Sequence, residues 1–150
     1  MLRRDSFSEW LSDPSYNIAL TLNFNSPVSL VNARGAVKKL FGVVDRKLLG
    51  ARFNRYTTGR VDGVFVFEHL KSNIHAHGLL QVDPRSVDRF ASIFPTDGRG
   101  SWSEIWKAGT QCLRHAHDPA GFAGYLAKEQ FASSAPETML FLREFYAQQG

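Results

Sequence analysis

The stretch from Asn73 to Val82 constrains the fold most, because its residues alternate between two kinds. Ile74 and Ala76 begin a series of small or apolar residues at every second position. His75 and His77 occupy positions between the members of that series. A period of two predicts a β-strand, since alternate side chains point to opposite faces of a sheet. One face would then join a core. The other would hold two imidazoles close enough to bind one metal ion, although two ordinary histidines are the plain alternative.

A second strand is predicted just upstream, in the β-branched and aromatic run Val61–His69. If a hairpin reverses between Lys71 and Ser72, residue numbers on the two strands pair to a constant sum, and Glu68 lies opposite His75. Directly opposed side chains have Cβ atoms about 5 Å apart, so Glu68 would join the two histidines as a third ligand. A slip of one residue would turn Glu68 to the other face. A solvated carboxylate, or an ion pair with Lys71, is the alternative.

Length and composition indicate one domain, spanning residues 1–150, with a core of ordinary size. Cys112 is the single cysteine, which excludes a disulfide framework and a multi-cysteine zinc site. The single cysteine is compatible with a reducing compartment, and we expect a cytoplasmic protein. No apolar run approaches the roughly 20 residues of a membrane span, so no membrane partner is expected. The formal charge of +4 favours a polyanionic partner.

Periodicity and breaker residues predict the other elements. The helix expected over residues 29–50 carries an apolar stripe that begins at Val31, and Gly50 is its predicted end. Two tryptophans, Trp102 and Trp106, are expected to pack in the core. Further strands are predicted over residues 16–25 and 109–117, and further helices over residues 84–94, 119–130 and 139–148.

Polar and basic residues near these elements form a candidate nucleic-acid interface. Small hydrogen-bonding residues line one face of the first strand, where they could lie beside the histidines. Basic residues interleaved with aromatic residues follow on the long helix and just after it, a composition that suits phosphate contact with base stacking. Solvated surfaces are the alternative for both groups. The candidate contacts are Thr21, Asn23, Arg34, Lys38, Arg52, Arg55 and Arg60.

Two further groups of residues carry possible chemistry. Tyr125 and Lys128 are three residues apart on a predicted helix and so share a face. His115 and His117 form a second His-Ala-His. We rank this pair below the first, because Asp118-Pro119 ends its strand at once.

Three pieces of the chain now stand in one order, namely Ala19–Asn23, then Glu68 with His75 and His77, then Tyr125–Lys128. This order resembles the HUH endonuclease superfamily, and most of all the rolling-circle replication initiators with one catalytic tyrosine. The resemblance covers roughly residues 17 to 131. It implies an α+β fold, in which helices pack on a central antiparallel sheet of about five strands related to the RNA-recognition motif.

Four strands are predicted from the sequence, so one strand of that fold is unassigned. We expect it within residues 1 to 16, around Tyr56 or near Trp102. The chain contains no Gly-x-x-x-x-Gly-Lys-Ser/Thr phosphate loop and therefore no helicase domain of the kind that some members carry. A host helicase is the implied partner.

The resemblance also implies an activity, which is the nicking and joining of single-stranded DNA or of a DNA hairpin at a replication origin. Tyr125 would be the nucleophile that forms a 5′-phosphotyrosine, and Lys128 would lower the pKa of its phenol or add positive charge. Glu68, His75 and His77 would hold Mn²⁺ or Mg²⁺. The alternatives are a transposase of the same superfamily, a non-catalytic nucleic-acid-binding module, and a metal hydrolase of small substrates.

Overall fold

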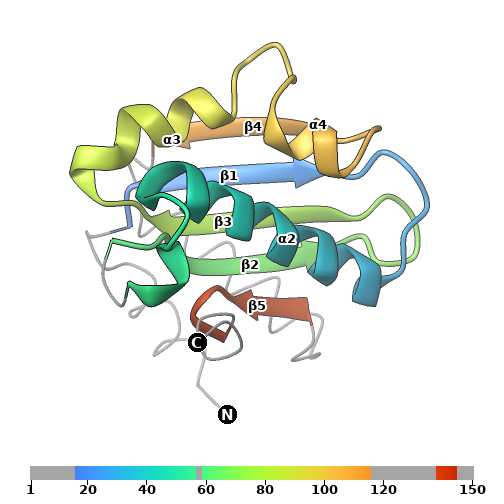
Figure 1. Cartoon of the computed structure of the whole chain (residues 1–150). Coiled ribbons are helices and arrows are strands. Elements are labelled where there is room, and N and C mark those ends of the chain that lie inside the picture. Colours follow the sequence, from blue (N-terminus) through green and yellow to red (C-terminus); the bar gives the residue numbers. More distant parts are fainter. Residues whose placement is uncertain (1–15, 57–58, 116–137, 145–150) are drawn as a thin grey trace.

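The computed structural model describes residues 16–56, 59–115 and 138–144. Within them lies one antiparallel sheet of five strands in the spatial order β4-β1-β3-β2-β5 (Figure 1). This confirms the predicted α+β class and places the strand with His75 and His77 at the centre of the sheet. The strands are β1 (Ile18–Asn23), β2 (Asp62–Glu68), β3 (His75–Gln81), β4 (Thr110–His115) and β5 (Met139–Phe141).

The described helices pack on one face of this sheet, where Figure 1 shows α2, α3 and α4 in front of the strands. No helix of the described residues is both long enough and apolar enough to cross a bilayer. The helices are α2 (Leu30–Leu49), α3 (Val87–Ile93) and α4 (Ser101–Ile105), with short 3-10 turns η1 (Phe53–Arg55) and η2 (Pro84–Ser86).

Helix α2 begins and ends where the sequence predicts. The Oγ of Ser29 accepts a hydrogen bond from the backbone N–H of Asn32 at 3.1 Å, which satisfies one of the unpaired donors of the first turn. At the other end Gly50 adopts a φ of +92° and donates its N–H to the carbonyl of Arg46. Glycine adopts this conformation without the penalty that a side chain would impose.

The buried stripe of α2 differs from the prediction at its first residue. Val31 was expected to face the core, yet 79% of its surface is exposed. Ala33 is fully buried instead. The reason is the helical period, since Ala33 lies four residues before the buried Val37 and shares its face, whereas Val31 lies six residues before it.

Period-two patterning produces the core. On β1 the residues Ile18, Leu20 and Leu22 are fully buried beneath the helices, as predicted. Trp102 is also fully buried, and its indole ring meets Phe24 edge-on with 5.0 Å between ring centroids. The predicted packing role of this tryptophan is confirmed.

The C-terminal prediction is wrong at β5. Residues 139–148 were expected to form a helix, but Met139–Phe141 pairs with β2, with Met139 opposite Val66 and Phe141 opposite Val64. This strand also supplies the fifth member of the sheet, which was expected elsewhere in the chain. The short apolar run is compatible with the period of a helix and with that of a strand. It forms a strand here because the edge of β2 offers backbone hydrogen-bonding groups that need partners.

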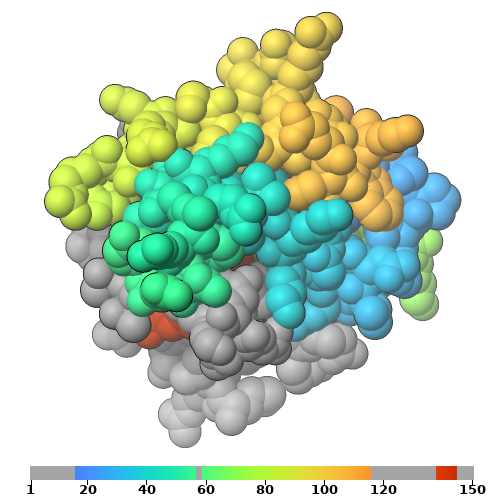
Figure 2. Space-filling view, in the orientation of Figure 1, coloured from blue at the N-terminus to red at the C-terminus, as the bar shows by residue number. Residues whose placement is uncertain are grey.

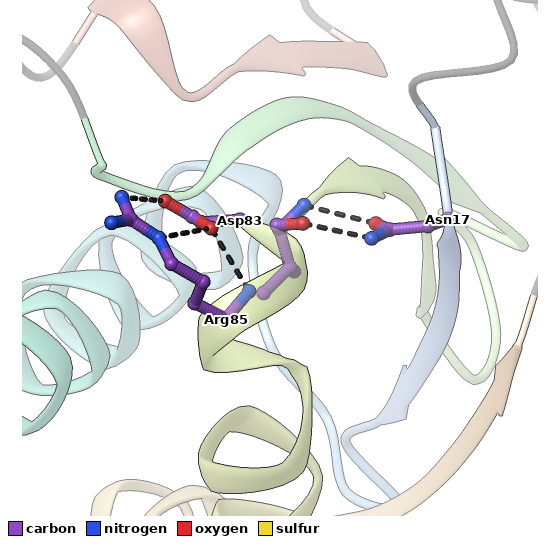
Figure 3. A network of polar contacts seen from close by, with 4 residues as sticks. Asn17, Asp83 and Arg85 are labelled. Carbon is purple, nitrogen blue, oxygen red and sulfur yellow. Dashed lines mark hydrogen bonds and ion pairs between the residues drawn. The ribbon is translucent and has the colours of Figure 1, made fainter.

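Polar contacts close the sheet at the end away from His75 (Figure 3). The Nδ2 of Asn17 donates to the carbonyl of Val82 at 2.8 Å, and the N–H of Val82 donates to the Oδ1 of Asn17 at 2.9 Å. Asp83 then accepts from the backbone and the guanidinium of Arg85, and these hydrogen bonds lower the pKa of the Asp83 carboxyl. The helical segment predicted to begin after Asp83 does so as η2 and α3.

Candidate metal centre and nucleic-acid interface

The predicted hairpin register is confirmed. Strand β2 pairs with β3 so that Glu68 lies opposite His75, and Asp62 lies opposite Gln81. On the other side of β3, Thr21 of β1 lies opposite His77, and Asn23 lies opposite His75. We call the sheet face that carries Glu68, His75, His77, Thr21 and Asn23 the histidine face. It is the face opposite α2.

His77 is held from two sides on this face. Its Nε2 lies 3.1 Å from the Oε2 of Glu68, and its Nδ1 lies 3.3 Å from the Oγ1 of Thr21. Glu68 is buried, with 8% of its surface exposed, so its carboxylate is not a solvated surface group. The Thr21 hydroxyl at Nδ1 fixes the plane of the His77 ring, so that Nε2 points to the Glu68 carboxylate. Metal-binding histidines are commonly oriented in this way, by a hydrogen bond to the ring nitrogen that does not bind the metal.

His75 stands beside His77 with its ring nearly parallel, at an interplanar angle of 5° and 6.2 Å between ring centroids. Burial lowers the pKa of His75, electrostatic interactions with His69 and His77 lower it further, and the Glu68 carboxylate opposes them with a smaller effect. The lowered pKa favours the neutral imidazole of His75, which is the form that binds metal.

His69 is a member of this group that the sequence analysis missed. Its ring meets that of His75 with 5.3 Å between centroids. His69 directly follows β2 and has a φ of +58°, which is an uncommon conformation for a residue other than glycine. The sequence predicted the hairpin turn but placed His69 within the strand, and its position directly after Glu68 was visible in the sequence.

The metal prediction fits Glu68 and His77 best. The 3.1 Å between their nearest atoms is close to the roughly 3.0 Å that separates neighbouring ligands of an octahedral ion with bonds of about 2.1 Å. No group of three or more His, Cys, Asp or Glu residues within the described ranges is already close enough to hold an ion. For Glu68, His75 and His77 to hold one ion together, their side chains therefore have to come closer than they are here. Two imidazoles and one carboxylate suit Mn²⁺ and related divalent ions.

Asn23 adds an unsatisfied acceptor to the histidine face. Its Oδ1 is buried and accepts no hydrogen bond from the part of the chain that the structure describes. A buried acceptor without a donor costs about 1–3 kcal/mol. The position of Asn23 opposite His75 makes a bound ligand a natural source of that donor.

The predicted basic contacts do not lie on the histidine face. Arg34 is on α2, where its guanidinium donates to the carbonyl of Met139 at 2.6 Å. Arg60 is buried, and its Nε lies 3.1 Å from the Oδ2 of Asp45. We therefore correct the prediction that Arg60 contacts phosphate, because its charge is engaged in a buried ion pair with Asp45. Lys38 lies on α2, and the exposed Arg52 and Arg55 follow that helix.

One basic residue on the histidine face was not predicted. Arg114 of β4 pairs with Ala19 and is exposed, so it shares a face with Thr21. It is the only lysine or arginine in the described strands that points to this face. Period-two reading of the predicted strand over residues 109–117 could have found it, since Cys112 and Arg114 alternate with Leu113.

Of the four remaining candidates, the structure describes His115. Tyr125, Lys128 and His117 lie outside the described residues. His115 pairs with Ile18 and therefore points to the face opposite that of His77. It does not join the group around Glu68.

Comparisons of this chain with protein-family models, with curated proteins and with solved structures found no match. A function is therefore inferred from the residues and their geometry.

Proposed function

We propose that this protein cuts and rejoins single-stranded DNA with a tyrosine nucleophile and a divalent ion, as HUH endonucleases that initiate rolling-circle replication do. One observation carries the proposal. On the central strand of an antiparallel sheet, His77 contacts the buried carboxylate of Glu68 on one side and the hydroxyl of Thr21 on the other. Both contacts involve residues that the sequence singled out for this chemistry.

The covalent step belongs to Tyr125. Its phenol loses a proton to water, and the phenolate oxygen attacks the scissile phosphorus. The bond from phosphorus to the 3′-oxygen breaks, that oxygen takes up a proton from water, and the upstream strand leaves with a 3′-hydroxyl. The downstream strand stays attached through a 5′-phosphotyrosine. Attack by a 3′-hydroxyl reverses these changes, so the strand is rejoined without ATP. Lys128, three residues further along a helix predicted from the sequence, would stabilise the phenolate.

Glu68, His75 and His77 are the residues that would hold the ion. A bound Mn²⁺ or Mg²⁺ supplies positive charge that polarises the scissile phosphate. Thr21 keeps the His77 ring oriented, and burial lowers the pKa of His75 and so favours its neutral ring. The buried position of Glu68 strengthens its electrostatic attraction for a cation.

Single-stranded DNA is the substrate that suits this face. Thr21 and Asn23 offer hydrogen-bonding groups, and Arg114 offers a positive charge two strands away from β3. An unpaired strand can lay its bases and phosphates along such a surface. We further propose that the DNA is the origin of a plasmid, phage or similar mobile element, that the protein acts in the cytoplasm, and that a host helicase opens the duplex.

The test uses a 3′-labelled oligonucleotide with a blocked 5′ end, prepared from a randomised pool, with Mn²⁺. We expect a labelled protein band on denaturing electrophoresis that disappears in Tyr125→Phe. That substitution removes one oxygen and keeps the ring, so folding and DNA binding are retained. Tyr56→Phe is the matched control, because Tyr56 is exposed and lies outside the histidine face. A labelled band that survives in Tyr125→Phe places the nucleophile elsewhere.

A non-catalytic nucleic-acid-binding module is the second candidate. The distance between Glu68 and His77 favours this candidate, because 3.1 Å also suits a direct hydrogen bond or ion pair between the two side chains, with no metal ion between them. Titration with Mn²⁺ distinguishes the nicking enzyme from the binding module. The measured quantity is the electron paramagnetic resonance signal of the free ion, which decreases as the ion binds. Binding of one ion that His77→Ala weakens supports the nicking enzyme, and no binding by the wild-type protein supports the module.

A further inference from the structure

A second candidate binding site lies on the helical side of the molecule, away from the histidine face. It is a depression of about 350 Å³ where the C-terminal end of α2 meets α3 and the start of α4. Figure 2 shows these three helices together on the surface. The depression is lined by Lys47, Leu48, Arg89, Ser92, Ile93, Gly100 and Ser101.

The charges in this depression are positive and are not neutralised by nearby acids. The Nζ of Lys47 donates to the Oγ of Ser101 at 2.7 Å, and a terminal nitrogen of Arg89 donates to the carbonyl of Lys47 at 2.8 Å. Both partners are neutral oxygens. Within the described residues, no carboxylate lies within 4.0 Å of either cationic group. This differs from Arg60 and Arg85, whose guanidinium groups are paired with acids.

Donor groups remain in the depression after these contacts. An ammonium has three N–H donors and a guanidinium has five, and each group uses one in its contact here. Ser101 is buried, and its hydroxyl accepts from Lys47, so its own hydrogen can be donated. Ser92 donates to the carbonyl of Arg89 at 2.6 Å and does not add a donor.

The backbone at Gly100 fixes this arrangement. Gly100 has a φ of +126°, and a Cβ there would come within 2.6 Å of the carbonyl oxygen of Ile93. Glycine thus lets the loop approach the end of α3 closely enough to set Ser101 against Lys47. The side chains of Leu48 and Ile93 are nearly buried and give the depression an apolar floor.

We propose that this depression binds the phosphate group of a nucleotide, with Lys47, Arg89 and the Ser101 hydroxyl as donors and the apolar floor beneath the sugar or base. The volume lies within the roughly 300–1,000 Å³ of small-ligand sites. The phosphate is either that of a free mononucleotide or one in a DNA strand. Because the carbonyl end of α2 carries partial negative charge, we expect a dissociation constant roughly in the micromolar to millimolar range.

The first test uses the wild-type full-length chain, without metal, in a ¹H–¹⁵N NMR titration. The probes are 2′-deoxyadenosine 5′-monophosphate, deoxyadenosine, and oligodeoxythymidine without a terminal phosphate. Shifts of the backbone amides of Ile93, Gly100 and Ser101 with the monophosphate alone support a free mononucleotide. The same shifts with the oligonucleotide support a phosphate within a strand. No shift of these amides, or equal shifts with deoxyadenosine, overturns the proposal.

The second test compares two variants of α2 that lose the same charge. Lys47→Met removes the ammonium and keeps the apolar stem, and we expect the probe that binds wild type to bind about tenfold more weakly, or worse. Lys39→Met is the matched control, because Lys39 is exposed on α2 and does not line the depression. An equal effect of both variants overturns the proposal, since it would reflect net charge alone. The outcome is independent of DNA cleavage on the histidine face.

Discussion

The histidine face and the helix-covered face of the sheet are made by the same strands but hold different kinds of residue. On β1, Leu20 and Leu22 are fully buried under the helices, whereas Thr21 and Asn23 keep partly exposed side chains on the other face. On β3, Ala76 is fully buried, and the neighbouring His77 meets Glu68. Alternate residues of one strand therefore serve stability and chemistry separately, and single substitutions can be chosen that affect mainly one of them.

The same comparison separates the basic residues. Arg34 and Lys38 lie on the helix that covers the apolar face, whereas Arg114 lies on the histidine face. A DNA strand that contacts both groups has to pass around an edge of the sheet. Basic composition in the sequence indicated a polyanionic partner without indicating which side of the molecule the partner contacts.

The largest expected effect is the loss of cleavage in His77→Ala. We expect cleavage with Mn²⁺ to fall by about a thousandfold or more, because the substitution removes a ligand of the ion that polarises the phosphate. The folded state should persist, with a loss of about 1–3 kcal/mol in the free energy of unfolding as Glu68 loses its contact with His77. Oligonucleotide cleavage and urea unfolding measure the two quantities. His115→Ala is the control, since His115 faces the other way, and a larger loss of cleavage there would assign the metal to the second histidine pair.

The complementary change is Phe65→Ala on the helix-covered face. Phe65 is fully buried and packs against Phe41 of α2, with 5.4 Å between ring centroids. We expect a loss of about 3–5 kcal/mol in the free energy of unfolding, measured by urea denaturation. Under conditions where the variant is folded, its Mn²⁺ affinity should match that of wild type. A lowered metal affinity would show that the two faces are not separable.

A smaller effect is expected at Gly78, which lies on the helix-covered face of β3. This residue follows His77 directly, lies opposite Phe65, and a Cβ there would come within 2.5 Å of the Phe65 ring. We expect Gly78→Ala to cost about 1–3 kcal/mol through overpacking. The double variant Gly78→Ala with Phe65→Leu should lose less than the sum of the two single changes, because the smaller side chain makes room. Strict additivity in urea unfolding would contradict this contact.

The smallest effect concerns the side of the molecule that binds DNA. Arg114→Ala should weaken binding to single strands of any sequence and flatten the dependence of log K on log salt by about 0.7, the value for one phosphate contact. Fluorescence anisotropy at several salt concentrations measures this slope. Arg52→Ala tests the helical side in the same assay. A flatter slope for Arg52→Ala with an unchanged slope for Arg114→Ala would move the DNA path to the helical side.

Much of the sheet could be predicted because local patterns and the fold agree there. The strand with His75 and His77 and its pairing with Glu68 follow from period two and one turn. The pairing of β1 with β3, which sets Thr21 opposite His77, joins distant parts of the chain and was expected only as a face beside the histidines. β5 could not be predicted, since Met139–Phe141 is too short to show a period, and its conformation depends on the open edge of β2.

The contact partners of the charged residues were beyond local reasoning as well. The ion pair between Arg60 and Asp45 joins residues on different elements, so their proximity depends on how α2 packs against the start of β2. The left-handed conformation of His69 likewise depends on the hairpin as a whole. Local sequence patterns identify the charged residues, but they do not predict which residue contacts which.

The hairpin between β2 and β3 has a consequence for how such a chain tolerates insertions and deletions. Glu68 and His75 are the last opposed pair before the turn, so residues added to the turn leave that pair in place. Lengthening a loop costs little, about 0.6 kcal/mol for each doubling. One residue inserted within β2, by contrast, reverses the facing of every position on one side of it. Length variation among descendants of this sequence should therefore accumulate in the turn and be rare in the two strands.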